Sequence, residues 1–285
     1  MPSVRDIKRR IKSVQSTQQI TKAMKMVAAS KLRRTQTAAI SARPYMNKLE
    51  EILGRIVASA GEIAHPLLVE RPVQNAAIIL ITADKGLAGG YNANVQKLAL
   101  QEASQLSEQG INVEFIPVGN KGRDFLRHRQ QKIKTALAGI NDVPTFSEAQ
   151  QLAKLVVDSY LAGQYDQVYL VYQEFVTTVQ QHPVSKQLLP LPYEKGEDEV
   201  EYLYEPAPQE VLTILLPQYI NNTILHFLTE AKASEHGARM AAMTSATDNA
   251  EEMLDKLNLS YNRSRQAAIT REISEIVGGA NALAQ

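Results

Sequence analysis

The residues best suited to chemistry in this chain are the glycines that follow its first strand-like run. The segment from Thr82 to Asn92 reads TADKGLAGGYN and combines three glycines with a lysine, which is a composition typical of phosphate-binding turns. Neither the spacing G-x-G-x-x-G nor the spacing G-x-x-x-x-G-K-[ST] is present, and Lys85 precedes the glycines instead of following them. We therefore expect a structural turn that packs on its neighbours, and nucleotide binding is the less favoured alternative.

The histidines and carboxylates give no positive sign of catalysis or of metal binding. The five histidines are scattered, and the two that share a predicted helix, His226 and His236, are ten residues apart, whereas a helical metal pair is spaced by about four. No two Asp or Glu residues are singled out by their spacing as general acid and base. The 285 residues include no cysteine, so no disulfide, thiolate ligand or thiol nucleophile is available. We expect no catalytic residue, no cofactor and no metal.

Charge is segregated along the chain, although its 31 basic and 30 acidic residues nearly cancel. The first 34 residues include ten Lys or Arg, opposed only by Asp6, whereas residues 194–205 include six Asp or Glu, opposed only by Lys195. A basic run is usually a solvated helix face, and a nucleic-acid-binding arm is the alternative. No aromatic residue precedes Tyr45, so the stacking partners common in single-strand binding are missing there. Contact with acidic protein loops explains the basic residues equally well.

Both ends of the chain carry the pattern of long helices. Apolar or small residues recur mostly at intervals of three and four from Val4 to Ile56, and again from Ile220 to Ser245. Ser3 is a suitable N-cap for the first helix. At 1.5 Å per residue the helices would be about 80 Å and about 100 Å long. Neither could bury its stripe in a small globule, so we expect them to pair as a long antiparallel coiled coil.

The middle of the chain alternates strand-like and helical segments. This alternation implies crossover connections and a mostly parallel sheet covered on both faces. The predicted strands are residues 76–83, 112–118, 131–137 and 167–172, and the predicted helices are residues 92–109, 121–130 and 144–162. The predicted fold is thus α/β, with an N-terminal coiled-coil helix at residues 1–60, a central Rossmann-like α/β domain at residues 74–205, and a C-terminal coiled-coil helix at residues 209–285.

Two segments of these helices closely resemble the gamma subunits of bacterial F-type ATP synthases. They are Gln19–Leu32, which reads QITKAMKMVAASKL, and Tyr261–Ile273, which reads YNRSRQAAITREI. Further segments resemble the family in its order, so that the resemblance covers nearly the whole chain: Asp84–Asn92, Gln187–Pro192, Tyr202–Pro206, Ala233–His236 and Thr247–Ala250. Two small departures are Lys85, where arginine is more usual, and Ala88, where cysteine is frequent.

The resemblance implies a non-catalytic rotor shaft. It would couple proton-driven rotation of the c ring to ATP synthesis and hydrolysis at the alpha and beta subunits. The positions that match the family's contacts with the beta subunit are Met24, Lys25, Arg265 and Gln266, and those that match its contacts with the c ring are Tyr202, Tyr204 and Glu205.

The resemblance also implies the partners and the location of the protein. The partners are the alpha, beta and epsilon subunits and the c ring, with one copy of this chain in the hetero-oligomer and no nucleic acid. The longest apolar runs, such as Ala76–Ile81, are far shorter than the roughly 18 residues of a membrane span. Any membrane role is therefore expected to be peripheral, through the complex, at the cytoplasmic face of the cell membrane. The absence of cysteine and the short Tyr193–Val200 stretch imply a bacterial type without the dithiol insertion of chloroplast relatives.

Overall fold

The computed structural model describes residues 3–59, 65–178, 180–192 and 207–283. The chain divides into a smaller unit, residues 1–27 with 240–285, and a larger unit, residues 28–239. Two long helices, α1 (Val4–Ser59) and α5 (Pro208–Leu283), contribute to both units. The expected N-cap of the first helix is confirmed, since Ser3 Oγ accepts the backbone N–H of Asp6 at 3.2 Å. Proline in the first turn suits the start of the last helix, because the missing N–H has no helical partner there.

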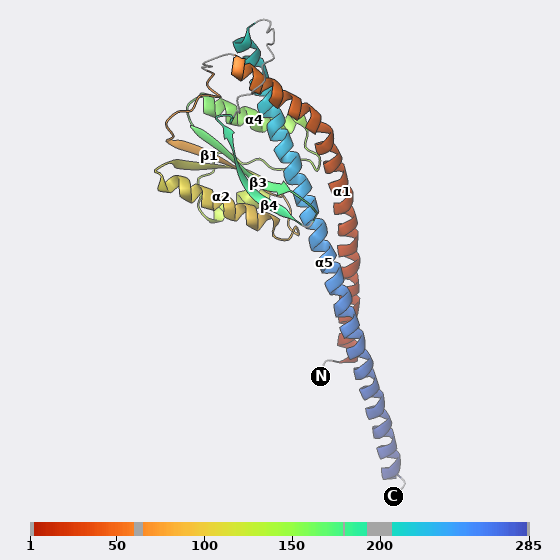
Figure 1. Cartoon of the computed structure of the whole chain (residues 1–285). Helices are drawn as coiled ribbons and strands as arrows, with labels where there is room; N and C mark the ends of the chain where they lie inside the picture. The colour runs from red at the N-terminus through yellow and green to blue at the C-terminus, as the bar shows by residue number, and fades with distance from the viewer. Residues whose placement is uncertain (1–2, 60–64, 179, 193–206, 284–285) are drawn as a thin grey trace. The chain divides into compact units, whose positions relative to one another are not determined.

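A four-stranded sheet with the strand order β2-β1-β3-β4 forms the centre of the larger unit (Figure 1). Strand β1 (Asn75–Ile81) pairs in parallel with β2 (Asn112–Val118) on one side and with β3 (Gln167–Phe175) on the other. Strand β4 (Gln181–Leu189) is antiparallel to β3. Every residue of β1 after Asn75 is buried, as expected for a parallel strand with both faces covered.

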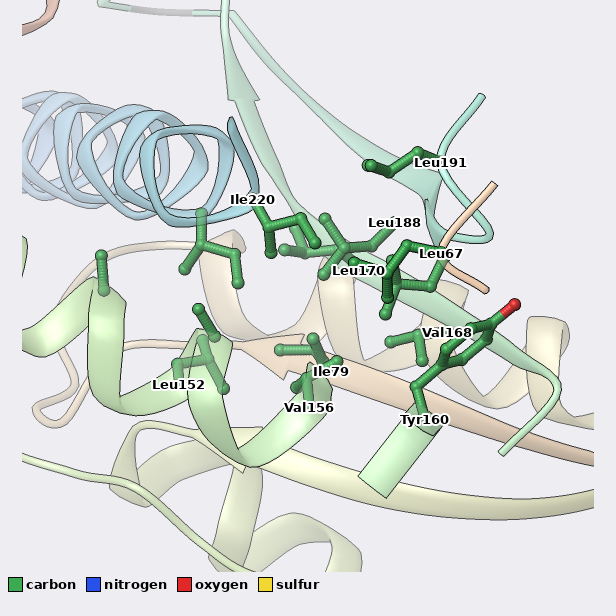
Figure 2. Close-up of a cluster of buried hydrophobic side chains, with 14 of the residues drawn as sticks. Leu67, Ile79, Leu152, Val156, Tyr160, Val168, Leu170, Leu188, Leu191 and Ile220 are labelled. Atoms are coloured by element: carbon green, nitrogen blue, oxygen red, sulfur yellow. The ribbon is translucent and has the colours of Figure 1, made fainter. Parts of the chain in front are cut away.

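Helices cover the two faces of the sheet with separate apolar clusters. Successive side chains of β1 point to opposite faces, so that Ile79 joins one cluster and Ile78 the other. The first cluster includes Leu152 of α4 (Phe146–Leu161) and Ile220 of α5, as Figure 2 shows. The second includes Val95 of α2 (Tyr91–Glu108). The short helix α3 (Asn120–His128) completes the unit.

The predicted fold class is confirmed, but one strand prediction is wrong and one strand was missed. The segment 131–137 is not a strand and makes only isolated bridges to β2, through Ile133 and Leu137. Its other side chains are exposed, so the segment has little apolar surface to hold it in the sheet. Strand β4 was not predicted, because His182, Pro183 and Lys186 interrupt any regular alternation of apolar residues. An edge strand tolerates such residues, since one of its sides has no strand neighbour.

In the smaller unit the two helices pack side by side and run in opposite directions (Figure 1). Their contact is made by small and polar residues as well as apolar ones. Thr247 Oγ1 donates to Thr21 Oγ1 at 2.8 Å, and Thr21 is buried together with Ile7, Met243 and Ala250. The antiparallel pairing expected from the sequence is therefore present, with a seam that allows close packing of the helices.

Candidate functional site

The carboxyl ends of β1 and β2 are where an open α/β sheet most often holds a ligand. Here the polar groups at this edge bond to the protein itself. The carboxylate of Asp84 accepts the backbone N–H of Asn120 at 2.9 Å and that of Gly139 at 3.0 Å. Thr82 Oγ1 accepts the N–H of Gly122 at 2.8 Å. The backbone N–H groups that could have bound a phosphate thus donate to Asp84 and Thr82 instead.

Glycine at this edge serves close packing between loops. Gly119 has a φ of +104°, and a Cβ added there would lie 2.8 Å from both the carbonyl carbon and Oγ1 of Thr82. The next glycine in α3, Gly122, is equally tight, with 2.8 Å between its added Cβ and the same hydroxyl. Real Cβ atoms do not approach other heavy atoms this closely. These two glycines therefore allow the start of α3 to approach the end of β1.

Helix α5 covers the remaining space at the carboxyl edge. The cavity left there has a volume of about 10 Å³ and is lined in part by Thr82, Tyr91, Lys232 and Glu235. Such a volume holds about one water molecule. Tyr91 donates its hydroxyl hydrogen to the carbonyl oxygen of Ala231 at 3.1 Å, which fixes the loop after β1 to the helix. The cavity between these described residues is therefore much smaller than a nucleotide.

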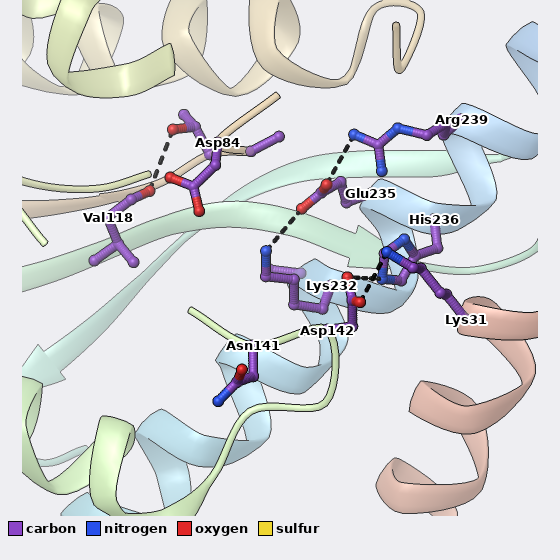
Figure 3. Close-up of polar contacts among 12 residues, drawn as sticks. Lys31, Asp84, Val118, Asn141, Asp142, Lys232, Glu235, His236 and Arg239 are labelled. Carbon is purple, nitrogen blue, oxygen red and sulfur yellow. Dashed lines mark hydrogen bonds and ion pairs between the residues drawn. The ribbon is translucent and has the colours of Figure 1, made fainter. Parts of the chain in front are cut away.

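The side of α5 that faces this edge carries a buried ion cluster (Figure 3). Glu235 pairs with Lys232 at 3.1 Å and with Arg239 at 2.8 Å, and all three side chains are largely buried. Burial acts to raise the pKa of Glu235, but the two cations outweigh it and the pKa is lowered. Burial and the charge of Glu235 raise the pKa of Tyr91. The cluster is therefore held as a carboxylate between two cations, facing a neutral phenol.

The first pair of predicted beta contacts lies in the smaller unit, on α1. Met24 and Lys25 are half-buried, whereas the neighbouring Ile20, Met26 and Val27 are among the exposed large apolar side chains. These three residues were not among the predicted contacts. Their exposure could have been predicted from the sequence, because they lie outside the apolar seam and therefore on the outer side of the helix.

The second pair of predicted beta contacts, Arg265 and Gln266, is exposed on α5. Every residue from Arg265 to Val277 is exposed, and the apolar ones include Ile269, Ile273 and Ile276. Spacings of four and three place these isoleucines on one helix face with Arg265 at its beginning. Within the described part of the chain, no carboxylate forms an ion pair with Arg265. This helix segment presents an apolar stripe that begins with a cation.

The predicted c-ring contacts Tyr202, Tyr204 and Glu205 lie outside the described residues. Among the helices of the described ranges, none combines the length and the hydropathy needed to cross a membrane.

Comparison with known proteins identifies the relatives of the chain. A family model described as ATP synthase matches residues 3–283. The ATP synthase gamma chain of Pelotomaculum thermopropionicum is 52% identical over 286 residues, covering 99% of this chain and 100% of the relative. That of Desulfitobacterium hafniense is 48% identical over 283 residues, with coverage of 99% and 100%.

Solved structures show the same fold. A chain in the central stalk and c-ring structure of Tetrahymena thermophila mitochondrial ATP synthase is 27% identical, with a TM-score of 0.59 over 80% of this chain and 99% of that chain. A chain in the structure of the OSCP, F1 and c-ring parts of Euglena gracilis mitochondrial ATP synthase has a TM-score of 0.66, over 98% of this chain and 94% of that chain. At 18% identity the latter likeness concerns the fold alone.

Proposed function

The chain belongs to the family of ATP synthase gamma chains, and we propose that it works as the central rotor shaft of an F-type ATP synthase without catalysing a reaction itself. The observation that carries the proposal is the match to gamma chains over nearly the full length of both proteins. The c ring would drive the rotation of the shaft, and the alpha and beta subunits would synthesise or hydrolyse ATP around it.

The proposed mechanism follows from the mismatch of symmetry between a shaft and a ring. A single asymmetric pair of helices inside a ring of three alpha and three beta subunits presents a different face to each beta subunit. Each beta subunit is then biased toward a different conformation and a different nucleotide affinity. A shaft contact that binds one conformation of a beta subunit more strongly than another shifts the population toward the first. Rotation passes these biases from one beta subunit to the next.

The exposed side chains of the smaller unit support the proposed contacts with the beta subunits. Met24 and Lys25 lie next to exposed apolar side chains, and Arg265 and Gln266 lie at the beginning of an apolar helix stripe. An apolar surface with few charges lets a shaft slide past neighbouring loops, whereas the cations offer sites where an acidic loop is pushed or held. Epsilon and the c ring are the proposed partners of the α/β domain, with Tyr202, Tyr204 and Glu205 as the proposed c-ring contacts.

The absence of catalysis is supported by the carboxyl edge of the sheet. Asp84 and Thr82 bond to backbone groups there, and the cavity beside them has room for about one water molecule. These observations argue against a small-molecule enzyme built on the α/β domain. The proposed location is the cytoplasmic face of the cell membrane, where the protein would be bound through the complex.

Reconstitution of the synthase with and without this chain tests the proposal. We expect ATP hydrolysis to drive proton uptake into vesicles only when the chain is present, and we expect calorimetry of the chain alone to detect no ATP site at millimolar nucleotide. Proton pumping by a complex that lacks the chain would contradict the rotor function. A stoichiometric nucleotide site or ATP hydrolysis by the isolated chain would contradict the non-catalytic role.

A further inference from the structure

A single loop of the α/β domain touches both long helices within the larger unit. The loop comprises residues 138–145 and precedes α4, and its central residue is Asp142. On the α1 side, Lys31 Nζ lies 2.8 Å from Oδ2 of Asp142. Thr35 Oγ1 lies 3.1 Å from the carbonyl oxygen of Asp142 and 3.0 Å from that of Lys31, so that the two carbonyls share its one hydroxyl hydrogen. Thr35 is completely buried, so its hydroxyl is held against the loop. Asp142 therefore contacts α1 through its side chain and its backbone.

The same carboxylate reaches α5. Nε2 of His236 lies 3.4 Å from Oδ1 of Asp142, and the side chain of His236 is only 1% exposed (Figure 3). Each oxygen of the carboxylate thus faces a different long helix. Asp142 thus contacts α1 through an ion pair and α5 through the ring of His236, whose nitrogens have no hydrogen-bond partner among the described residues.

The loop is itself fixed to the α/β domain at several points. The backbone N–H of Gly139 donates to Oδ2 of Asp84 at 3.0 Å, and that of Asn141 donates to Oε1 of Glu148 at 2.8 Å. The end of the loop is the N-cap of α4, where Thr145 and Glu148 form a capping box. These hydrogen bonds before and after Asp142 restrict the conformation of its backbone, so that Asp142 moves together with the α/β domain.

We propose that Asp142 is a positioning residue that fixes α1 and α5 to the α/β domain, so that torque applied to the domain turns both helices together. This proposal rests on the rotor function proposed above. Nonpolar packing also holds α1 to the domain, as in the cluster that includes Leu53 and Ile56. Nonpolar contacts resist separation of the surfaces, but they are non-directional and resist sliding less than a directed ion pair and hydrogen bond do.

The charges around Asp142 suit this role at neutral pH. Burial acts to raise the pKa of Asp142, but Lys31 outweighs it and the pKa is lowered, so the residue is a carboxylate. Burial lowers the pKa of His236 to about 4, against the effects of Glu235 and Asp142, so the imidazole is neutral. The electrostatic attraction therefore acts between Asp142 and Lys31, while the neutral ring of His236 packs against Oδ1 of the carboxylate.

Asp124 provides a matched control for the substitution of Asp142. It also pairs with a cation, Arg123 at 2.9 Å, and its side chain is 50% exposed compared with 48% for Asp142. The pair of Asp124 lies within α3, however, and joins no two elements. Asp142→Asn and Asp124→Asn thus remove similar ion pairs, of which only the first connects the domain to the long helices.

The test measures torsional stiffness in the complete synthase, with the head fixed on a surface, a gold rod attached to the c ring and the enzyme stalled with ADP. We expect Asp142→Asn to increase the angular variance of the rod above that of Asp124→Asn, because the lost ion pair no longer restrains the domain against α1. Thr35→Val should add to this increase. Lys31→Met should act like Asp142→Asn, and the double variant should exceed neither, because the two residues form one interaction. Asp142→Glu should restore much of the stiffness.

Equal variance for Asp142→Asn and Asp124→Asn would overturn the proposal, as would strictly additive effects of Lys31→Met and Asp142→Asn. The urea midpoints of the variants should stay close to that of the wild type, which separates loss of positioning from loss of folding. If Asp142→Asn does not assemble, Lys31→Met tests the same contact from α1. If the rod on the wild-type enzyme does not turn relative to the head during ATP hydrolysis, the proposed rotor function is wrong. This outcome is distinct from a failure of the Asp142 proposal, which only the variants test.

Discussion

His236 is a buried histidine whose ring nitrogens have no hydrogen-bond partner among the described residues. The charged groups that face it are Asp142 from the loop before α4, Lys31 from α1 through Asp142, and Lys232, Glu235 and Arg239 from its own helix. Burial lowers its pKa to about 4, below the value of about 6.5 in an unfolded chain. Protonation therefore favours the unfolded state.

The sign of the resulting pH dependence is fixed by this lowered pKa. The stabilising contribution of neutral His236 is complete above about pH 6.5 and decreases as the pH falls toward 4, by about 2 kcal/mol between pH 7 and pH 5. We expect His236→Gln to remove most of this loss, measured as the free energy of unfolding in urea at both pH values. The exposed His128 provides the control, since His128→Gln should leave the loss unchanged. A small remaining slope is expected from His65, whose pKa burial also lowers.

Arg265 is a long cation without an ion-pair partner in the described part of the chain, at the beginning of the stripe formed by Ile269, Ile273 and Ile276. A hydrogen bond to a charged partner group is worth about 1.5 to 3 kcal/mol, so Arg265→Ala should reduce coupled turnover of the reconstituted complex about ten-fold or more. The helix should remain folded, as circular dichroism can show. Arg263→Ala is the control, because a separation of two residues places Arg263 on another face of the same helix. ATP hydrolysis at the wild-type rate in the Arg265 variant would contradict a contact with the beta subunit.

At the scale of elements, the approach of α3 to β1 depends on Gly119. An added Cβ would lie 2.8 Å from two atoms of Thr82, at a φ of +104° that side chains rarely adopt. Gly139 also has a positive φ, of +78°, but open space surrounds the position of its Cβ. We expect Gly119→Ala to lower the free energy of unfolding by at least about 2 kcal/mol, and Gly139→Ala by about 1 kcal/mol. Equal effects in thermal or urea unfolding would show that the backbone conformation alone sets the cost.

The helices and the parallel strands of this fold were predicted well from the sequence, because the helices carry periodic apolar positions and the buried strands carry apolar runs. Strand β1 is apolar throughout after Asn75, and α1 repeats its apolar positions over most of its length. The segment 131–137 and strand β4 were misjudged because pairing at a sheet edge depends on the neighbouring strand as well as on the residues themselves. Sequence patterns say little about such tertiary effects.

The candidate site was predictable only in part, for a similar reason. The glycine-rich loop packs on its neighbours as expected, with Ala83 and Ala88 buried against Ala238, whereas its lack of nucleotide binding remains a prediction. The contact of Asp142 with α1 and α5 could not be foreseen, because Thr35 and Asp142 are 107 residues apart. No local pattern marks a residue that joins elements so distant in the sequence. The predicted contacts at Met24, Lys25, Arg265 and Gln266 come from the family resemblance and remain predictions.

At the scale of the whole molecule, a shaft must exchange force with its surroundings at both the head and the membrane ring. The proposed head contacts lie on the two helices of the smaller unit. The proposed ring contacts Tyr202, Tyr204 and Glu205 lie in the acidic, proline-closed stretch that joins β4 to α5 along the chain and is outside the described residues. Loops carry function when a rigid scaffold positions them, and here the scaffold would be the α/β domain.

Replacing Tyr204 and Glu205 with alanine should therefore weaken docking to the c ring while leaving the head active. We expect ATP-driven proton pumping by the membrane-bound complex to fall clearly more than ATP hydrolysis by the detached head, because only the first activity needs the ring contact. Both assays are made on the same variant, so differences in expression cancel in their ratio. An equal loss in both assays would assign Tyr204 and Glu205 to folding, since a misfolded shaft fails in the head as well. Unchanged activity in both would make the stretch a solvated linker, as its charge alone suggests.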